Sequence, residues 1–152
     1  TDCLLQSGVR KVFAIDVGHG QLAWKIRDDP RVIALEKVNA RRLSPEQIPE
    51  PIELCVIDVS FISLTLILPP AFELLTPDGV IVALINPQFE LARADVGRGG
   101  IIRSPELHAK AQEKIATFAR TLGARMAGLF PSPITGTDGN QEFFICLRKL
   151  SE

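Results

Sequence analysis

The sequence predicts an α/β fold with a mostly parallel sheet, and two observations support this prediction. Three short apolar runs each end in an acidic residue; they occupy residues 11–16, 31–36 and 54–58 and end at Asp16, Glu36 and Asp58. Segments with helical character alternate with runs of this kind, which is typical of parallel sheets. With 152 residues, of which 46% are hydrophobic and 23% charged, the chain is long enough for one domain with a substantial core.

Local signals predict the other elements. Glycine favours helix C-termini, whereas proline opens a helix or breaks it. The expected helices cover residues 1–6, 21–26, 64–75 with a bend at Pro69 and Pro70, and 105–122. Residues 86–104 are expected to form a long loop. Further strands are expected at residues 80–85, 124–130 and 142–147, and because no helix joins the last two, one of them is expected to run antiparallel at an edge.

Asp58 is the first candidate for a functional residue. Ligands of open α/β sheets bind outside the carboxyl ends of the strands, and Asp58 directly follows an apolar run. The alternative is that Asp58 only caps the helix that follows. Asp16 has a similar position, and an acid at such a place commonly accepts hydrogen bonds from the ribose hydroxyls of a nucleotide cofactor. A glycine-rich loop should precede it by about 20 residues, and this chain contains none, which either argues against a nucleotide cofactor or means that the first strand is missing.

Composition and motif spacing exclude several classes of function. No apolar run approaches the roughly 20 residues of a membrane helix, and a net charge of −1 gives no overall attraction to nucleic acid. The three cysteines show no C-x-x-C spacing, which argues against a metal site. His19 and His108 have no serine or cysteine at a nucleophile spacing, so both are predicted to be structural. We expect a cytoplasmic protein that is neither a membrane protein nor a hydrolase.

Four stretches of the chain resemble the TlyA (hemolysin A) family of FtsJ-like ribosomal RNA methyltransferases. They are DVGHGQLAWKIRDDPRV at residues 16–32, DVSFISL at 58–64, PQFE at 87–90 and GNQEF at 139–143. The resemblance implies a Rossmann-like class I methyltransferase that uses S-adenosylmethionine to methylate ribose 2′-hydroxyls of ribosomal RNA. It also implies that residues 1–152 are a single methyltransferase domain that lacks its first strand, the glycine-rich cofactor loop and an upstream S4-like RNA-binding domain.

The resemblance assigns roles to individual residues. By this match, Asp16 holds the ribose of the cofactor and Glu36 lies near its adenosine. Asp58 is expected to contact the cofactor as well as to act in catalysis, and Phe61 and Asn140 are expected to line the cofactor or substrate pocket.

The catalytic residues of these relatives form a Lys-Asp-Lys-Glu set, which this chain matches only in part. Asp58 matches the aspartate and Glu142 the glutamate, whereas Asn86 stands where the second lysine is expected. An amide carries no charge and is no base, and the loss of one such group typically reduces the rate by about 10²- to 10³-fold. We therefore expect a weakened or inactive enzyme unless Lys37 or Lys149 reaches the site.

Three arginines of the 86–104 loop complete the expected site. Arg93, Arg98 and Arg103 are expected to contact RNA phosphates if the resemblance holds, and to lie on a solvated surface loop otherwise. The expected partners are ribosomal RNA or ribosomal subunits, and the alternative function is a non-catalytic RNA- or ribosome-binding module. Membrane lysis, which the hemolysin name suggests, is not expected, because the amphipathic helix carries ordinary core residues.

Overall fold

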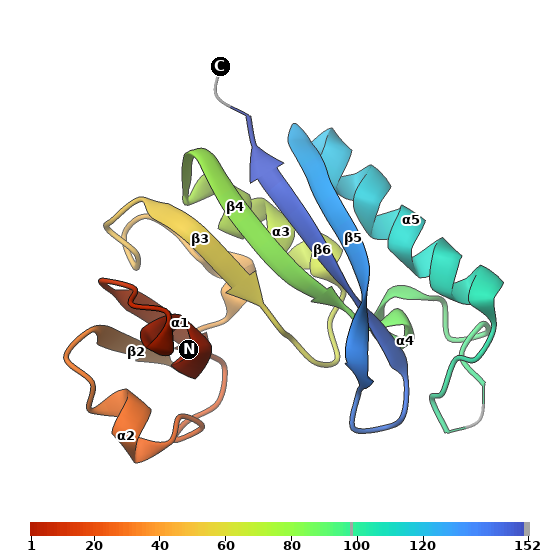
Figure 1. Ribbon diagram of the computed structural model, residues 1–152, viewed down its shortest axis with the longest axis horizontal. Coiled ribbons are helices and arrows are strands. Elements are labelled where there is room, and N and C mark those ends of the chain that lie inside the picture. Colours follow the sequence, from red (N-terminus) through yellow and green to blue (C-terminus); the bar gives the residue numbers. More distant parts are fainter. Residues whose placement is uncertain (98, 151–152) are drawn as a thin grey trace. The chain divides into compact units, whose positions relative to one another are not determined.

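The computed structural model describes residues 1–97 and 99–150, and the chain forms two units, Thr1–Glu50 and Pro51–Glu152. The first unit contains a two-stranded sheet and the second a four-stranded sheet (Figure 1).

The N-terminal unit places two acidic strand ends next to each other. Its elements are α1 (Asp2–Gln6), β1 (Val12–Asp16), α2 (Trp24–Arg27), β2 (Val32–Glu36) and the 3-10 helix η1 (Ala40–Arg42). Helix α1 ends just before Gly8, which adopts a φ of 81° as a helix-ending glycine does. Strands β1 and β2 are parallel, and Asp16 is the register partner of Glu36. Both predicted strands of this unit are therefore confirmed, with their acids at the same end.

The C-terminal unit contains a mixed sheet. Its elements are β3 (Ile52–Ile57), the 3-10 helix η2 (Leu64–Leu66), α3 (Leu68–Glu73), β4 (Leu75–Ile85), α4 (Pro87–Glu90), α5 (Pro105–Thr121), β5 (Ala124–Thr135) and β6 (Gln141–Lys149). The strand order is β3-β4-β6-β5. Strands β3 and β4 are parallel, and β6 runs antiparallel to both of its neighbours. The edge strand β5 is thus paired in the antiparallel direction, as predicted.

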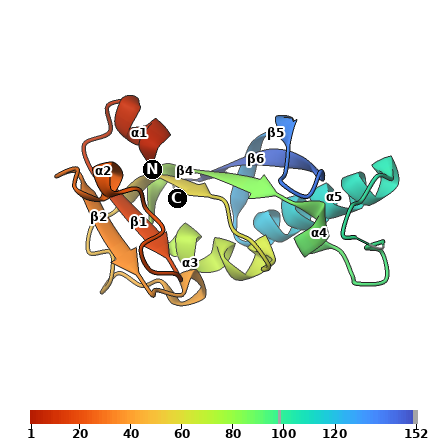
Figure 2. The same ribbon diagram turned by 90° about the horizontal axis from the view of Figure 1, so that it is seen from below.

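The core of this unit lies between the sheet and two helices. Ile81, Ala83 and Ile85 of β4 have no exposed surface and alternate with half-buried residues, as expected for side chains that point to opposite faces of a strand. Helices α3 and α5 lie on the same side of β4 and β6 (Figure 2). Ala111 and Ile115, on the predicted apolar face of α5, are fully buried. Ser104 caps this helix by accepting a hydrogen bond from the Leu107 amide.

Several predicted boundaries were wrong. The expected helix over residues 64–75 is two helices, η2 and α3. Pro69 lies in the first turn of α3, where a proline is tolerated, and η2 ends before it. The strand expected at residues 80–85 begins earlier, at Leu75, and its register with β3 shifts between Leu75 and Val80. Helix α4 lies in the expected loop after residue 86, and β5 extends to Thr135.

None of the helices within residues 1–97 and 99–150 has both the length and the apolar character needed to cross a membrane.

Candidate functional site

Three polar residues meet at one end of the four-stranded sheet. Asp58 follows the last residue of β3, and Asn86 follows the last residue of β4. Glu142 is the second residue of β6, and its neighbour Phe143 is the register partner of Ile85 at the end of β4. Parallel β3 and β4 end at the same edge, and antiparallel β6 begins there, so the topology brings the three residues together.

Asn86 links the end of β4 to Glu142. Its Nδ2 donates a hydrogen bond to Glu142 Oε1 over 3.0 Å. Its Oδ1 accepts a hydrogen bond from the Gln88 amide over 3.1 Å, and this bond caps α4. Asparagine is a favoured N-cap residue because its short side chain reaches the free amides of the first helical turn. The same side chain therefore begins a helix and orients an acid.

Glu142 lies in an environment that disfavours its charge. Partial burial raises the pKa of the Glu142 carboxyl, and the negative charge of Asp58 raises this pKa further, whereas the hydrogen bond from Asn86 opposes both effects. The carboxylate also lies close to the backbone of Gly136, where a Cβ atom would be 2.8 Å from Glu142 Oε1. Two carboxyl groups and one amide thus share a site in which a proton can be held or accepted.

Asp58 does not cap the helix that follows it. Ser63 is the N-cap residue of η2, and its side chain accepts a hydrogen bond from the Thr65 amide. The alternative interpretation of Asp58 as a helix cap is therefore wrong. The exposed Asp58 side chain is available at the strand end.

The two acids of the N-terminal unit differ from each other in their contacts. Asp16 Oδ1 accepts a hydrogen bond from the Gly18 amide over 2.6 Å. Glu36 accepts hydrogen bonds from the Gly20 amide at 2.8 Å and from both terminal nitrogens of Arg27, and it pairs with His19 Nδ1 at 2.5 Å. The hydrogen bond from Gly20 lowers the pKa of Glu36, as do its pairs with His19 and Arg27. Glu36 thus holds the turn that follows β1, and its predicted contact with a cofactor stays a prediction.

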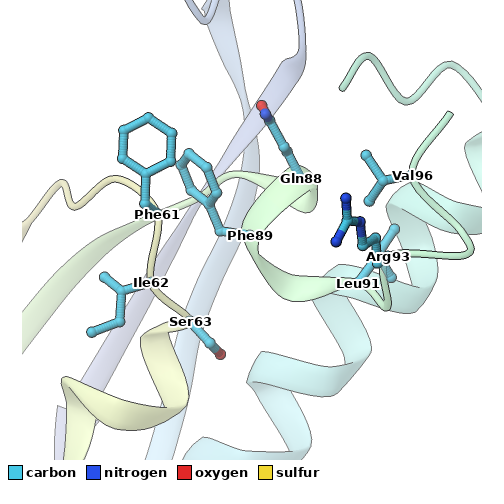
Figure 3. Close-up of a pocket in the computed structure, with 8 residues that line it drawn as sticks. All are labelled: Phe61, Ile62, Ser63, Gln88, Phe89, Leu91, Arg93 and Val96. Carbon is cyan, nitrogen blue, oxygen red and sulfur yellow. The ribbon is translucent and has the colours of Figure 1, made fainter. Parts of the chain in front are cut away.

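An open pocket with a volume of about 680 Å³ lies beside residues 61–63, in the segment that follows Asp58. The rings of Phe61 and Phe89 lie next to each other at one end, 5.4 Å apart between centroids and tilted by 53°, and Arg93 lies toward the other end (Figure 3). Phe61 is 89% exposed and has a φ of 62°, which is uncommon for a residue other than glycine. Gln88 also lines this pocket. Phe89 was missed by the sequence analysis, although it lies in one of the stretches that carry the family resemblance.

Asn140 is buried inside the protein. Only 1% of it is exposed, and its Oδ1 accepts a hydrogen bond from the Ile102 amide at 2.8 Å. Its Nδ2 donates to Gln88 Oε1 and to the Gly100 carbonyl. Asn140 therefore joins α4 to the end of the loop before α5, and its predicted place in the lining of a ligand pocket stays a prediction.

The two lysines that could replace the missing catalytic lysine belong to different units. Lys149 donates to the carbonyls of Phe72 and Leu75 and thus holds the end of α3. Lys149 is the last residue of β6, whereas Glu142 is near the first, so Lys149 does not reach the end of the strand at which Glu142 lies. Lys37 belongs to the N-terminal unit.

Of the two predicted RNA-binding arginines that the structure describes, one lines the pocket. Arg93 does so, Arg103 is exposed just before α5, and Arg98 lies outside the described residues. Among the residues that the structure describes, no group of three or more His, Cys, Asp or Glu side chains is arranged to bind a metal ion.

Comparison with known proteins gives these features a family context. Residues 1–149 match the model of the FtsJ-like methyltransferases. The chain is 45% identical to the 16S/23S rRNA (cytidine-2′-O)-methyltransferase TlyA of Mycobacterium tuberculosis, over 97% of this chain and 55% of that protein. It thus spans about half the length of this curated relative.

Solved structures show the same fold. The crystal structure of a candidate hemolysin from Lactococcus lactis matches 99% of this chain and 75% of that one, at 44% identity and a TM-score of 0.93. A SAM-dependent methyltransferase from Methanosarcina mazei matches at a TM-score of 0.64 and 16% identity, over 99% of this chain and 87% of that one, and so shares the fold alone. The predicted Rossmann-like methyltransferase fold is confirmed, and the chain belongs to the FtsJ-like methyltransferase family.

Proposed function

We propose that the chain is the catalytic part of an S-adenosylmethionine-dependent enzyme that methylates ribose 2′-hydroxyls of ribosomal RNA in the cytoplasm. The observation that carries this proposal is the cluster of Asp58, Asn86 and Glu142 at one sheet edge of a protein in the FtsJ-like family. The M. tuberculosis relative is named a 16S/23S rRNA (cytidine-2′-O)-methyltransferase, which supports the same substrate class.

The cluster offers groups for the proton chemistry of this reaction. A ribose hydroxyl must lose its proton as its oxygen accepts a methyl group, and a carboxylate with a raised pKa is suited to accept that proton. We assign this role to Glu142, and to Asp58 the role of a second acid that keeps the pKa of Glu142 high. Asn86 donates one amide hydrogen to Glu142, which leaves its second hydrogen to stabilise charge on the ribose oxygen.

Asp16 has the contacts that a cofactor-binding acid requires. Its Oδ1 accepts the Gly18 amide, and within the described part of the N-terminal unit Oδ2 accepts no hydrogen bond. A carboxylate with an available oxygen at a strand end is suited to accept hydrogen bonds from ribose hydroxyls. S-adenosylmethionine, when bound, supplies the methyl group, and we assign its ribose to Asp16.

The pocket beside Phe61 is suited to a nucleotide of the RNA. Stacking of a base on an aromatic ring contributes about 1–3 kcal/mol. Phe61 and Phe89 each lie three residues after the end-of-strand residues Asp58 and Asn86, so a nucleotide stacked on these rings would bring its 2′-hydroxyl near the ends of β3 and β4. Arg93, in the same pocket, is suited to a phosphate. These groups support a single-stranded or flipped-out nucleotide as the substrate.

The domain organisation stays a proposal as well. We infer that a further strand pairs with β3 in the complete protein, because β3 is an apolar edge strand of the four-stranded sheet, and proteins normally pair or cover such an edge. Slow hydrogen exchange of the β3 edge amides in the complete gene product would support this strand, and fast exchange would contradict it.

A second function is favoured by Asn86 alone. Because no lysine is present at this position, the protein can have kept the fold and RNA binding and lost the chemistry. Such a protein would bind ribosomal RNA or ribosomal subunits without methylating them.

Transfer of tritium from labelled S-adenosylmethionine to ribosomal RNA separates the two functions. The complete gene product that contains this chain is incubated with isolated ribosomal subunits, and the labelled nucleotide is identified by ribose analysis. We expect label on a 2′-oxygen. Absence of label together with retained RNA binding would contradict the enzyme and support the non-catalytic module.

A further inference from the structure

Among the described residues of the C-terminal unit, the most deeply buried acid lies outside the cluster of Asp58, Asn86 and Glu142. Glu90 is the last residue of α4, and 1% of its side chain is exposed. Burial of a carboxylate is costly unless the group is paired and hydrogen-bonded. The partners of Glu90 must therefore compensate for the cost of burying its charge.

The partners of Glu90 come from two other segments. Its Oε1 accepts a hydrogen bond from the Leu64 amide at 2.8 Å, and its Oε2 accepts one from Ser63 Oγ at 2.6 Å. Lys114 Nζ, from the middle of α5, lies 3.1 Å from Oε2 and donates to the Glu90 carbonyl over 2.6 Å. One carboxylate thus ties the start of η2 to α4, and Lys114 holds it in place.

The two segments that Glu90 joins are those that carry the reactive groups. The segment before η2 begins at Asp58 and contains Phe61, and α4 begins at its cap, Asn86. The left-handed conformation of Phe61 persists only where the surrounding structure imposes it. The bonds of Glu90 to the two residues that begin η2, and the contact of Phe61 with the ring of Phe89, supply this restraint.

We propose that Glu90, held by Lys114, is a positioning residue that fixes the loops bearing Asp58 and Asn86 at the spacing at which both meet Glu142. Its effect on rate rests on the proposed methyl transfer, whereas its effect on geometry does not. A displacement of reacting groups by about 1 Å can reduce a rate by about 10²-fold, so a restraint of this kind matters for catalysis.

The test uses the charge of Asp58 as a reporter of its distance from Glu142. In the complete protein labelled with ¹³C at glutamate carboxyls, the Glu142 signal is assigned by its loss in Glu142→Gln and titrated by NMR. The Glu90→Gln variant is expected to shift the pKa of Glu142 downward, because Asp58 moves away and its repulsion weakens. Methyl transfer, where present, is expected to fall about 10- to 100-fold in kcat.

Two further variants distinguish positioning from folding. Lys114→Met leaves a buried carboxylate without its cation, and it is expected to lower the melting temperature more than Glu90→Gln does. The double variant Glu90→Gln/Lys114→Met removes both charges and is expected to recover stability but not the wild-type pKa of Glu142. Glu113→Gln, one residue from Lys114 on α5 and exposed, serves as the matched control and is expected to leave the pKa of Glu142 unchanged.

An unchanged pKa of Glu142 in folded Glu90→Gln and in the double variant would overturn the proposal, because Glu90 would then stabilise the fold only. This result is independent of activity: a shifted pKa without any methyl transfer in the wild type would support the positioning role and contradict the enzyme.

Discussion

The strand-end acids of the two units differ in how their charges are compensated. Glu36, in the N-terminal unit, accepts hydrogen bonds from the Gly20 amide and the Arg27 guanidinium and pairs with His19, and its pKa is lowered. Glu142, in the C-terminal unit, has a raised pKa. The two residues are the same type of acid, but burial and the charge of Asp58 raise the pKa of Glu142, whereas hydrogen bonds and cationic partners outweigh burial at Glu36.

This difference indicates that Glu142, rather than Glu36, is suited to exchange a proton. Glu36 stays charged, and its partners use this charge to hold a turn. Glu142 faces the charge of Asp58 and receives one neutral hydrogen bond, from Asn86. Within the described residues of the C-terminal unit, no lysine, arginine or histidine forms an ion pair with Asp58 or Glu142. A perturbed acid without a compensating cation is a typical candidate for catalysis.

The largest effect is expected from Asp58→Asn, which removes the negative charge that repels Glu142. Methyl transfer to ribosomal RNA is expected to fall by at least about 10²- to 10³-fold, and the pKa of Glu142 to fall toward its ordinary value. The rate is measured by tritium transfer and the pKa by NMR titration. Asp78→Asn, an exposed acid in β4, is the control. A pKa of Glu142 that does not change would show that Asp58 is not its repulsive neighbour.

Asn86→Lys would give Glu142 a cationic partner, as Glu36 has in Arg27. An ammonium group beside two carboxyl groups is expected to lower the pKa of Glu142 and to raise methyl transfer about 10²-fold, because it can stabilise charge on the ribose oxygen. The same tritium assay measures the gain. Thr137→Lys, an exposed position in the β5–β6 turn, controls for the added charge alone. An unchanged rate would show that this position does not limit the enzyme.

Glu36→Gln tests whether the charge of Glu36 stabilises the folded protein. The pKa of Glu36 is lowered in the folded protein, so its charge stabilises the fold above the ordinary pKa of about 4.3, and this contribution is lost as pH falls through the lowered value. The variant is expected to melt at a lower temperature than the wild type at pH 7, with a smaller difference near pH 3. Calorimetry at both pH values measures it, and Glu46→Gln is the exposed control in the same unit.

Glu142→Gln is expected to have the opposite sign and a smaller size. Because the pKa of Glu142 is raised in the folded protein, the wild type loses stability as pH rises from about 4.3 through the raised pKa. The variant does not titrate, so it is expected to melt slightly higher than the wild type at neutral pH and equally at low pH. A lower melting temperature of the variant at neutral pH would refute the repulsion between the two acids.

The smallest effect is expected from Arg93→Ala, which tests whether the pocket contacts a phosphate. Loss of one phosphate contact is expected to weaken RNA binding across sequences and to reduce the slope of log affinity against log salt by about 1. Filter binding at several salt concentrations measures this slope. Arg125→Ala, an exposed arginine of β5, is the control. An unchanged slope would remove Arg93 from the proposed RNA contacts.

Much of the fold was predictable because its signals are local. The apolar runs that end at Asp16, Glu36 and Asp58 are strands with their acids at the ends, and Ser104 begins α5 as its pattern indicates. Helix α4 was missed although its signal was present, because Asn86 followed by Pro87 is a typical helix start. A helix of one turn is too short for hydrophobic periodicity to reveal.

Most of the elements, the acids at their ends and the family resemblance follow from the sequence alone, because each depends on residues that are close together along the chain. Which of these residues meet depends on the three-dimensional fold. Asn86 reaches Glu142 across 56 positions, and Glu90 reaches Lys114 across 24. Lys149, by contrast, is directed to the end of α3 by its position at the far end of β6. Such partners are set by strand order and register, which place distant segments side by side and which no local pattern specifies.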